Sequence, residues 1–512
     1  MNVEETTPGQ LLSTSLERQL RTAMLSNNPR RLLAAVVAAT TVLVPCAASP
    51  TGQKPLTAWD EPSSAPYNFT KIEQSSELCD AGSKFWTGSI QISPEKSMFY
   101  WYFESRDDPK NDPVLLWMSG GPGATGEFGL FKETGPCGVN PDGNSTFRRE
   151  HSWTNHANVL FIDQPIGVGF STLTNRDHMS VNLLDGAKDL YAFLSIFAAT
   201  AHPETADKAW HITGESMAGH YVTAYIQYIL QQQRNGATQG QGLNINIETA
   251  MIVDGYIDNT RSTVGFYEFL CLDWRGDGSE PLFGLAKCAA MKSGIAKCEA
   301  EGARCREAYS VDVCIKADAR CDKALGHFFW EKVKEGARHV CEVPPLCADL
   351  QGGPANEFLN RPWVQRSLGF NTTVPYEIID MDANERWVED GHLFVPTTRE
   401  LTWLLDETDV RILFINGNED ILINSPGQIR MLDEQPWKGQ APYKEQEFEE
   451  WHYARGKLAE GVEVDGAVKG GTRKGTGRLS LALVDDAGHM APADQPEGVG
   501  ALVWAWMRDG EH

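Results

Sequence analysis

The stretch KAWHITGESMAGHYVTAYIQYILQQQ, residues 208–233, joins a short apolar run, a turn and a long helical pattern. Ser216 follows the turn at Gly214, in a context close to the G-x-S-x-G elbow that exposes a nucleophilic serine between a strand and a helix. Ala218 replaces the second glycine of that pattern, and Gly219 comes next. A serine among small residues is common in ordinary loops, so the motif needs support from the rest of the chain.

Strand patterns and helix patterns alternate on both sides of this stretch. Apolar strand patterns that end in turn residues occur at 97–105, 112–123, 157–171, 246–258, 410–423 and 478–492, and helical spacing occurs at 187–201 and 498–510. Such alternation predicts an α/β fold with a mainly parallel, mixed central sheet. The strand patterns stop where cysteines cluster, which predicts an inserted, disulfide-rich helical cap.

The chain of 512 residues exceeds the roughly 250–300 residues of a usual single core, so it needs a subdivision. We expect a signal peptide with an N-terminal extension at 1–48 and a linker or propeptide-like segment at 49–75. The α/β core then occupies 76–258, the Cys-rich helical insertion 259–355, and the second part of the core 356–512.

A targeting segment is predicted near the N-terminus. Arg30 and Arg31 precede the apolar run 32–44, and small residues suited to cleavage follow near Ala47 or Ala48. The run is shorter than the roughly 18 residues that indicate a membrane span. Translation from Met24 and a type II signal anchor are the alternatives. The signal predicts the secretory pathway, with an extracellular or vacuolar/lysosomal destination.

Cysteine usage and glycosylation sequons support this compartment. An even number of cysteines outside the signal predicts up to five disulfides, and a zinc site is the alternative, although no C-x-x-C pair occurs. These cysteines are Cys79, Cys137, Cys271, Cys288, Cys298, Cys305, Cys314, Cys321, Cys341 and Cys347. Acceptor sequons begin at Asn68, Asn144 and Asn371. The net charge of −24 argues against nucleic acid and anionic membrane surfaces as partners.

Two further strand ends carry the partners that a nucleophilic serine needs. Asp420 lies in FINGNEDILIN and His489 in LVDDAGHMAP, each just after a predicted strand. The order Ser216, Asp420, His489 is that of α/β hydrolases, with His489 as the base and Asp420 as the residue that orients it. A post-strand aspartate is often a turn residue, and a lone histidine is often a loop residue. Three such residues in this order favour the triad.

An oxyanion hole needs backbone donors, and SGGPG, residues 119–123, supplies them after an apolar strand. The N–H groups of Gly121 and Met217 are the expected pair. A simple tight turn is the alternative interpretation.

Five ordered motifs together resemble the serine carboxypeptidases, the S10 peptidase family: WMSGGPG, KETGP, FIDQPIGVGFS, GESMAGHY and AGHMAPADQP. The resemblance runs from about residue 76 to the C-terminus. It implies an α/β-hydrolase fold and removal of C-terminal residues from peptides and proteins through an acyl-enzyme at acidic pH, without metal or cofactor. It also assigns the triad to Ser216, Asp420 and His489 and the oxyanion hole to Gly121 and Met217.

The family binds the terminal carboxylate of its substrate with an Asn, a Gly N–H and two carboxylic acids. The matching positions here are Ser119, Gly120, Glu133 and Glu215. Two adjacent carboxyl groups cannot both ionise readily, so one keeps a proton and can donate a hydrogen bond. Ser119 in place of Asn predicts that one hydrogen bond to the substrate is lost or carried by water.

Other departures from the family pattern leave the triad intact. The family's Cys-Ser-Ser is 124–126 (Ala-Thr-Gly) here, so the disulfide of that Cys is absent, and the family's Tyr after the nucleophile is Met217. Ile423 replaces a frequent Cys, and Asp254 precedes Gly255 where the family has Asn-Gly. We expect these changes to alter the specificity for side chains.

Two other classes of function stay open at this point. An acyltransferase or esterase could use the same acyl-enzyme, and a binding protein could use the same scaffold without catalysis. Composition does not decide between a monomer and a homodimer.

Overall fold

The computed structural model describes residues 68–237, 242–334, 353–454 and 467–508, and the compact unit that they form is Phe69–His512. The predicted signal peptide, the start at Met24 and the pairing of Cys341 and Cys347 lie outside the described residues.

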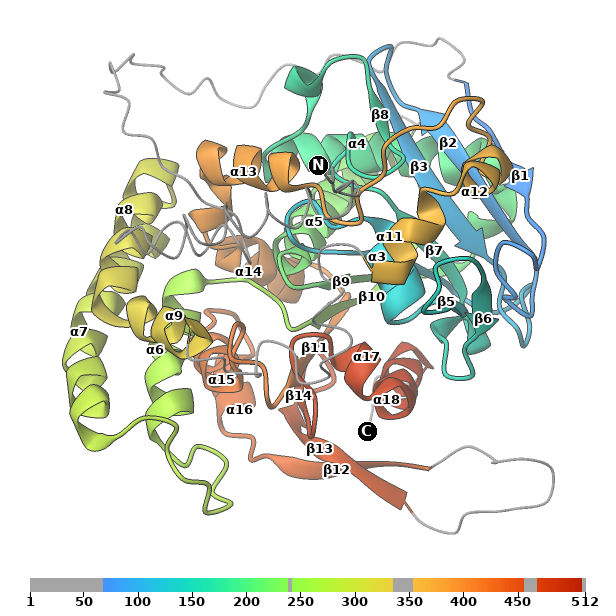
Figure 1. The fold of residues 1–512 in the computed structure, drawn as a ribbon. Helices are drawn as coiled ribbons and strands as arrows, with labels where there is room; N and C mark the ends of the chain where they lie inside the picture. Colours follow the sequence, from blue (N-terminus) through green and yellow to red (C-terminus); the bar gives the residue numbers. More distant parts are fainter. Residues whose placement is uncertain (1–67, 238–241, 335–352, 455–466, 509–512) are drawn as a thin grey trace, which may run out of the picture. The chain divides into compact units, whose positions relative to one another are not determined.

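One mixed sheet of twelve strands runs through the described part of the chain (Figure 1). Its order is β1-β2-β3-β7-β4-β9-β10-β11-β14-β13-β12, and β8 pairs with β3. The strands are β1 (Ile72–Glu73), β2 (Phe85–Gln91), β3 (Lys96–Phe103), β4 (Val114–Met118), β7 (Asn158–Ile162), β8 (Thr172–Leu173), β9 (Ala209–Glu215), β10 (Asn246–Val253), β11 (Arg411–Gly417), β12 (Glu449–Ala454), β13 (Ala467–Gly475) and β14 (Leu479–Val484). From β7 to β14 every neighbouring pair is parallel, so the carboxyl ends of these strands meet at one edge. A separate hairpin joins β5 (Cys137–Val139) to β6 (Thr146–Arg148).

Alternating side chains of the central strands enter two hydrophobic cores, one on each face of the sheet. In β4, Leu116 belongs to one core, while Leu115 and Trp117 belong to the other. The first core includes side chains of α4 (Leu183–Ile196), α5 (Ala218–Ala237), α13 (Met381–Asp390), α14 (Thr398–Glu407), α15 (Ser425–Asp433) and α16 (Gln440–Lys444). The second includes side chains of α3 (Gly126–Lys132), α11 (Gly353–Leu359), α12 (Pro362–Ser367), α17 (Ala491–Asp494) and α18 (Pro496–Arg508). This layering is the predicted α/β-hydrolase fold.

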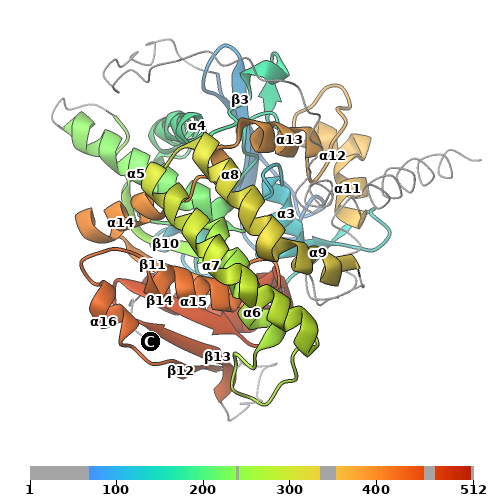
Figure 2. The same cartoon turned by 90° about the vertical axis from the view of Figure 1, so that its left-hand side faces the viewer.

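Along the chain between β10 and β11, which are neighbours in the sheet, helices occur where the disulfide-rich insertion was predicted. They begin with α6 (Asn259–Cys271), α7 (Leu285–Ala308), α8 (Val311–Cys321) and α9 (His327–Lys334), and α7 packs along α8 (Figure 2). Among the described residues of this insertion there are three disulfides: Cys271–Cys288, Cys298–Cys321 and Cys305–Cys314. A fourth joins Cys79 to Cys137. The boundaries predicted at 258/259 and 355/356 stay a prediction.

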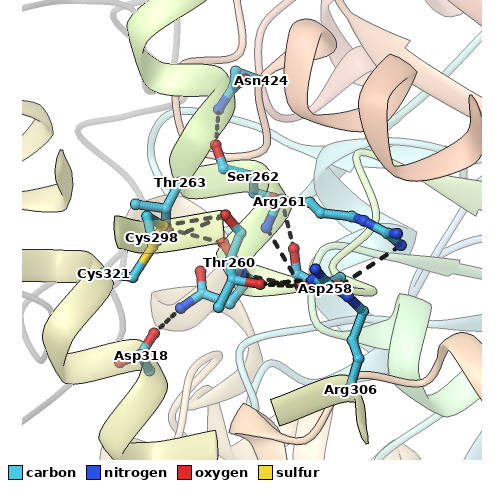
Figure 3. The surroundings of a disulfide bond; sticks show 11 residues. Asp258, Thr260, Arg261, Ser262, Thr263, Cys298, Arg306, Asp318, Cys321 and Asn424 are labelled. Atoms are coloured by element: carbon cyan, nitrogen blue, oxygen red, sulfur yellow. Dashed lines mark hydrogen bonds and ion pairs between the residues drawn. A yellow bond between two sulfur atoms is a disulfide. The ribbon is translucent and has the colours of Figure 1, made fainter. Parts of the chain in front are cut away.

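The start of α6 connects the insertion to the core (Figure 3). Asp258 caps this helix by accepting hydrogen bonds from the N–H groups of Thr260 and Arg261, and Arg306 of α7 lies 2.9 Å from its other oxygen. Asn424, just beyond β11, donates to the carbonyl of Ser262 at 2.9 Å. The insertion is therefore hydrogen-bonded to the loop that follows β11.

A buried carboxyl pair supports the start of α3. Glu127 and Asp163 are both almost fully buried and contact each other. Asp163 accepts hydrogen bonds from the N–H groups of Gly126 at 2.9 Å and Phe170 at 2.7 Å. Glu127 accepts one from the Trp101 indole at 2.8 Å. Burial and then the neighbouring Glu127 carboxyl raise the pKa of Asp163 well above its ordinary value.

This pair predicts a pH-dependent stability that Glu127→Gln reduces. Because the folded state raises the pKa of Asp163, its proton stabilises the fold at low pH, and this contribution is lost as the pH rises toward the folded-state pKa. Glu127→Gln replaces the neighbouring carboxyl with a neutral amide and removes this cause of the raised pKa of Asp163, so the variant should be more stable than the parent at pH 7 and should gain little near pH 4.

Denaturant unfolding at several pH values measures this difference. The exposed Glu150→Gln is the matched control and should change stability little at any pH. A Glu127→Gln protein that loses stability at pH 7 relative to the parent would contradict the assignment.

Candidate active site

The turn between β9 and α5 holds Ser216 in a strained backbone conformation. Its φ is 60°, in the left-handed region that non-glycine residues seldom adopt, and its N–H donates to the carbonyl of Val253 at 2.9 Å. A Cβ on Gly214 would lie 2.6 Å from the Cβ of Ala218, and one on Gly219 would lie 2.8 Å from the carbonyl oxygen of Tyr256. The small residues of the motif are therefore required by close packing around a partly exposed serine.

Asp420 and His489 form a hydrogen-bonded pair beyond the ends of β11 and β14. The Nδ1–H of His489 donates to Oδ2 of Asp420 at 2.7 Å, and the Asp420 carboxyl is fully buried. The other oxygen of Asp420 accepts the N–H groups of Leu422 at 2.8 Å and Ile423 at 3.1 Å. Both oxygens of Asp420 are thus used, one to hold its own loop and the other to hold the imidazole.

The charge state of His489 reflects opposing effects. Burial lowers its pKa, but the Asp420 carboxylate and then Glu133 raise it, and the net pKa is above the ordinary histidine value. The imidazole side chain keeps 14% of its surface exposed, which leaves an edge open to a reactant.

Ser216, Asp420 and His489 lie at the ends of strands that share one block of the sheet. β9 pairs with β10, β10 with β11, and β11 with β14. Among the described residues, the Ser216 hydroxyl makes no hydrogen bond to His489; such bonds are often long or poorly aligned in unliganded enzymes.

The glycine-rich loop after β4 lies directly against the Ser216 turn. A Cβ on Gly120 would be 2.8 Å from the backbone nitrogen of Met217 and 2.5 Å from the carbonyl oxygen of Glu215. Gly121 has φ of 106°, which favours glycine. The loop and the turn therefore bring together the two backbone segments that carry the predicted donors, Gly121 and Met217.

Glu133 and Glu215 form a second buried carboxyl pair, next to Ser216. Glu133 is 1% exposed at the C-terminal end of α3, and Glu215 is 5% exposed at the end of β9. Neither oxygen of Glu133 accepts a hydrogen bond from an N–H or O–H donor of the described residues, so the contact between the two carboxyl groups needs a proton. Burial and then Glu133 raise the pKa of Glu215 well above its ordinary value. Burial also raises the pKa of Glu133.

Ser119 makes a different contact from the one that sequence reasoning considered. Its hydroxyl is buried and accepts a hydrogen bond from the Trp117 indole N–H at 3.1 Å. The structure therefore gives this hydroxyl a protein partner on the preceding strand, β4, and does not bring it into hydrogen-bond contact with Glu133 or Glu215.

Two residues near the site were not recognised from the sequence as site residues. Asp494 accepts the N–H of Gly488 at 2.8 Å and so holds the residue before His489. Arg149 donates to the carbonyl oxygen of Glu133 at 2.9 Å, at the end of α3. The only sequence signal for Asp494 was its place in AGHMAPADQP, and Arg149 left none because its partner is a backbone atom distant in sequence.

The surface features predicted from the sequence lie at accessible positions. Asn68, Asn144 and Asn371 are all exposed. None of the helices in the described ranges combines the length and apolar character needed to span a bilayer.

Comparison with known proteins gives one consistent result. The sequence model of the family described as "Serine carboxypeptidase" matches residues 79–509. A Carboxypeptidase Y homolog A of Phaeosphaeria nodorum is 31% identical over 83% of this chain and 73% of its own length. Its counterpart from Botryotinia fuckeliana is 30% identical over 81% of this chain and 71% of its own. Among solved structures, the prohormone-processing carboxypeptidase Kex1(delta)p of Saccharomyces cerevisiae superposes with a TM-score of 0.65 at 20% identity, covering 86% of this chain and 96% of that one.

The geometry predicts which serine reacts and what its reactivity depends on. We expect a serine-directed phosphonylating reagent to modify Ser216, and Ser216→Ala to abolish the modification. Asp420→Asn leaves the imidazole in place but no longer fixes its tautomer, so labelling should slow by about 10³- to 10⁴-fold. Mass spectrometry of the labelled peptide and the rate of labelling measure both effects; modification of another serine, or an Asp420→Asn rate within tenfold of the parent, would contradict the assignment.

Proposed function

Because this chain belongs to the serine carboxypeptidase family, and is accordingly a hydrolase that releases C-terminal amino acids from peptides, we propose that Ser216, His489 and Asp420 carry out its reaction. His489 removes the proton of the Ser216 hydroxyl as the oxygen attacks the last peptide carbonyl. The imidazolium then protonates the leaving amino acid, and water releases the acyl group by the same route. Asp420 stabilises the imidazolium through the 2.7 Å hydrogen bond.

The negatively charged oxygen of the tetrahedral intermediate needs hydrogen-bond donors. We assign these to the N–H groups of Gly121 and Met217, because the close approach of the Gly120 loop to Met217 leaves no room for side chains there. Loss of one such donor costs about 10²- to 10³-fold in kcat. Met217 contributes through its backbone, and its buried side chain belongs to the first hydrophobic core.

The observation that carries the specificity for a free C-terminus is the buried Glu133–Glu215 pair beside Ser216. Its carboxyl oxygens have no donor from the described protein residues apart from each other, and both pKa values are raised. The pair therefore holds a proton that it can donate to a substrate carboxylate. Gly120 N–H is the second donor, and Ser119 contributes less because its hydroxyl already contacts Trp117.

An acyltransferase or esterase would not need this pair. The family assignment and the proton-holding carboxyl groups both favour hydrolysis of peptides with a free terminus. A binding protein without catalysis is disfavoured by the strained serine and the paired imidazole.

Two ionisations bound the activity from opposite sides. His489 must be neutral to accept a proton, and its raised pKa makes activity fall at the acidic end. The carboxyl pair must keep its proton; its stabilising contribution to binding is present at low pH and is lost as the pH rises through the raised pKa of Glu215. The raised pKa of His489 sets the lower limit of the active pH range, and the raised pKa of Glu215 sets the upper limit.

These ionisations predict that peptide binding, more than chemistry, weakens with rising pH. For an N-blocked dipeptide, KM should rise by up to about tenfold per pH unit above the pKa of the pair, because only the protonated pair binds the carboxylate. The corresponding C-terminal amide should bind poorly and show no such rise. Glu215→Gln cannot ionise at this position, so it should flatten the rise for the free acid at some cost in affinity.

Steady-state hydrolysis of both substrates between about pH 4 and 8 measures this, with Ser216→Ala as the inactive control. Equal hydrolysis of acid and amide, or an unchanged pH dependence of KM in Glu215→Gln and Glu133→Gln, would exclude this role for the pair. Ester turnover without peptide turnover would favour the acyltransferase or esterase alternative.

We also propose that the protein passes through the secretory pathway, to an extracellular or vacuolar/lysosomal destination, as a monomer or homodimer. The four disulfides are consistent with an oxidising compartment. The exposed sequons at Asn68, Asn144 and Asn371 support N-glycosylation. Endoglycosidase treatment of protein from a eukaryotic secretory host should lower its mass, and the triple Asn→Gln variant should show no change; an untreated protein of unmodified mass would contradict glycosylation.

A further inference from the structure

Asp254 is a fully buried carboxyl group directly behind the proposed triad. It follows β10, has φ of 43°, and donates its own N–H to the carbonyl of Ile415 at 2.7 Å. Its Oδ1 accepts the N–H of Gly417 at 2.7 Å, and its Oδ2 accepts the N–H of Ala491 at 3.4 Å. One side chain thus hydrogen-bonds to the end of β11 and to the start of α17, which are more than 70 residues apart in the chain.

These two segments flank the acid and the base of the triad. Gly417 lies three residues before Asp420, and Ala491 lies two residues after His489. The residue before Asp254 completes the connection, because the carbonyl of Val253 accepts the N–H of Ser216 at 2.9 Å. The end of β10 is therefore bonded to all three segments that carry the triad.

The backbone of Asp254 is strained, as is that of Ser216. A non-glycine residue in the left-handed region is strained and persists where surrounding contacts over-determine it. Here the surrounding contacts are the three hydrogen bonds to β11 and to the His489 loop.

The groups that face Asp254 are acidic. They are Asp420 beyond β11, Asp494 of α17 and Glu215 of β9. Burial, followed by Asp420, raises the pKa of Asp254 well above its ordinary value, which favours its neutral form. The Nδ1 of His489 is already hydrogen-bonded to Asp420. Asp254 can therefore influence the position of the imidazole only through the backbone segments that it bonds at Gly417 and Ala491.

We propose that Asp254 is a positioning residue for the reaction. Its carboxyl group fixes the end of β11, just before Asp420, relative to the start of α17, just after His489. This rests on the proposed roles of Ser216, Asp420 and His489. Outer residues that orient reactive groups in this way commonly contribute about 10- to 100-fold to activity.

The test compares two substitutions at this position. Asp254→Gly removes the carboxyl while allowing the positive φ, and should lower kcat by about 10- to 100-fold with KM changed by less than about threefold. Asp254→Asn keeps an acceptor for Gly417 but turns a donor toward Ala491, so it should recover part of the loss and retain a deficit of about three- to tenfold in kcat. In the pH profile of kcat/KM for Asp254→Asn, the acidic limb should lie at the same pH as in the parent, because the Asp254 carboxyl is already neutral at acidic pH.

Asp189→Ala is the control for general destabilisation. It removes another buried carboxyl, bonded to Lys96 at 2.8 Å and Ser180 at 2.7 Å, away from the triad loops. Its kcat should match the parent once the folded fraction is measured by thermal unfolding. The parent, Ser216→Ala and Asp420→Asn are measured in the same assay and test the triad itself. These controls distinguish an incorrect triad assignment from an incorrect role for Asp254.

Three results would overturn the proposal. One is a folded Asp254→Gly protein with kcat within about threefold of the parent. Another is an equal loss of kcat in Asp189→Ala. The third is an Asp254→Asn protein with parental kcat, or one whose acidic limb moves to lower pH at unchanged plateau, which would indicate a charge effect. If Asp254→Gly does not fold, the Asp254→Asn result alone decides.

Discussion

The left-handed backbone at Ser216 is the constraint on which the rest of the site depends. A strand that ends in such a turn and continues as a helix requires very small neighbours, and Gly214, Gly219 and Gly120 are each packed against backbone or Cβ atoms that would exclude a side chain. The same close approach brings the Gly120 loop against the backbone of Met217. A single strained residue therefore sets both the exposure of the serine and the position of the loop that faces it.

Buried carboxyl groups are the second organising feature of this acidic chain. Glu133 with Glu215, Glu127 with Asp163, and Asp254 beside Asp420 are all removed from solvent, and in each group burial raises the pKa of at least one member. In each set, the carboxyl oxygens accept hydrogen bonds from backbone N–H groups or share a proton with a neighbouring carboxyl group. Such groups are most favourable at low pH, which links the stability of the fold and the state of the site to the same variable.

The insertion is coupled to the site through α6. Its cap, Asp258, is bonded to Arg306 of α7, and its Ser262 carbonyl is bonded to Asn424 of the loop that also carries Asp420. The disulfides Cys298–Cys321 and Cys305–Cys314 join α7 covalently to α8. The inserted helices and the loop that carries Asp420 are therefore joined by hydrogen bonds.

The sequence by itself determined the features that depend on local order. The elbow around Ser216, the post-strand positions of Asp420 and His489 and the α/β alternation all follow from residue types at short spacing, since parallel strands place their carboxyl ends at one edge whatever the loops do. The contacts between distant segments required the three-dimensional fold: Glu127 faces Asp163, and Asp254 joins Gly417 to Ala491. The fold also decided the direction of the Ser119 hydroxyl, which contacts nearby Trp117. The disulfide partners also required it, because pairing depends on distances between side chains that linear spacing does not encode.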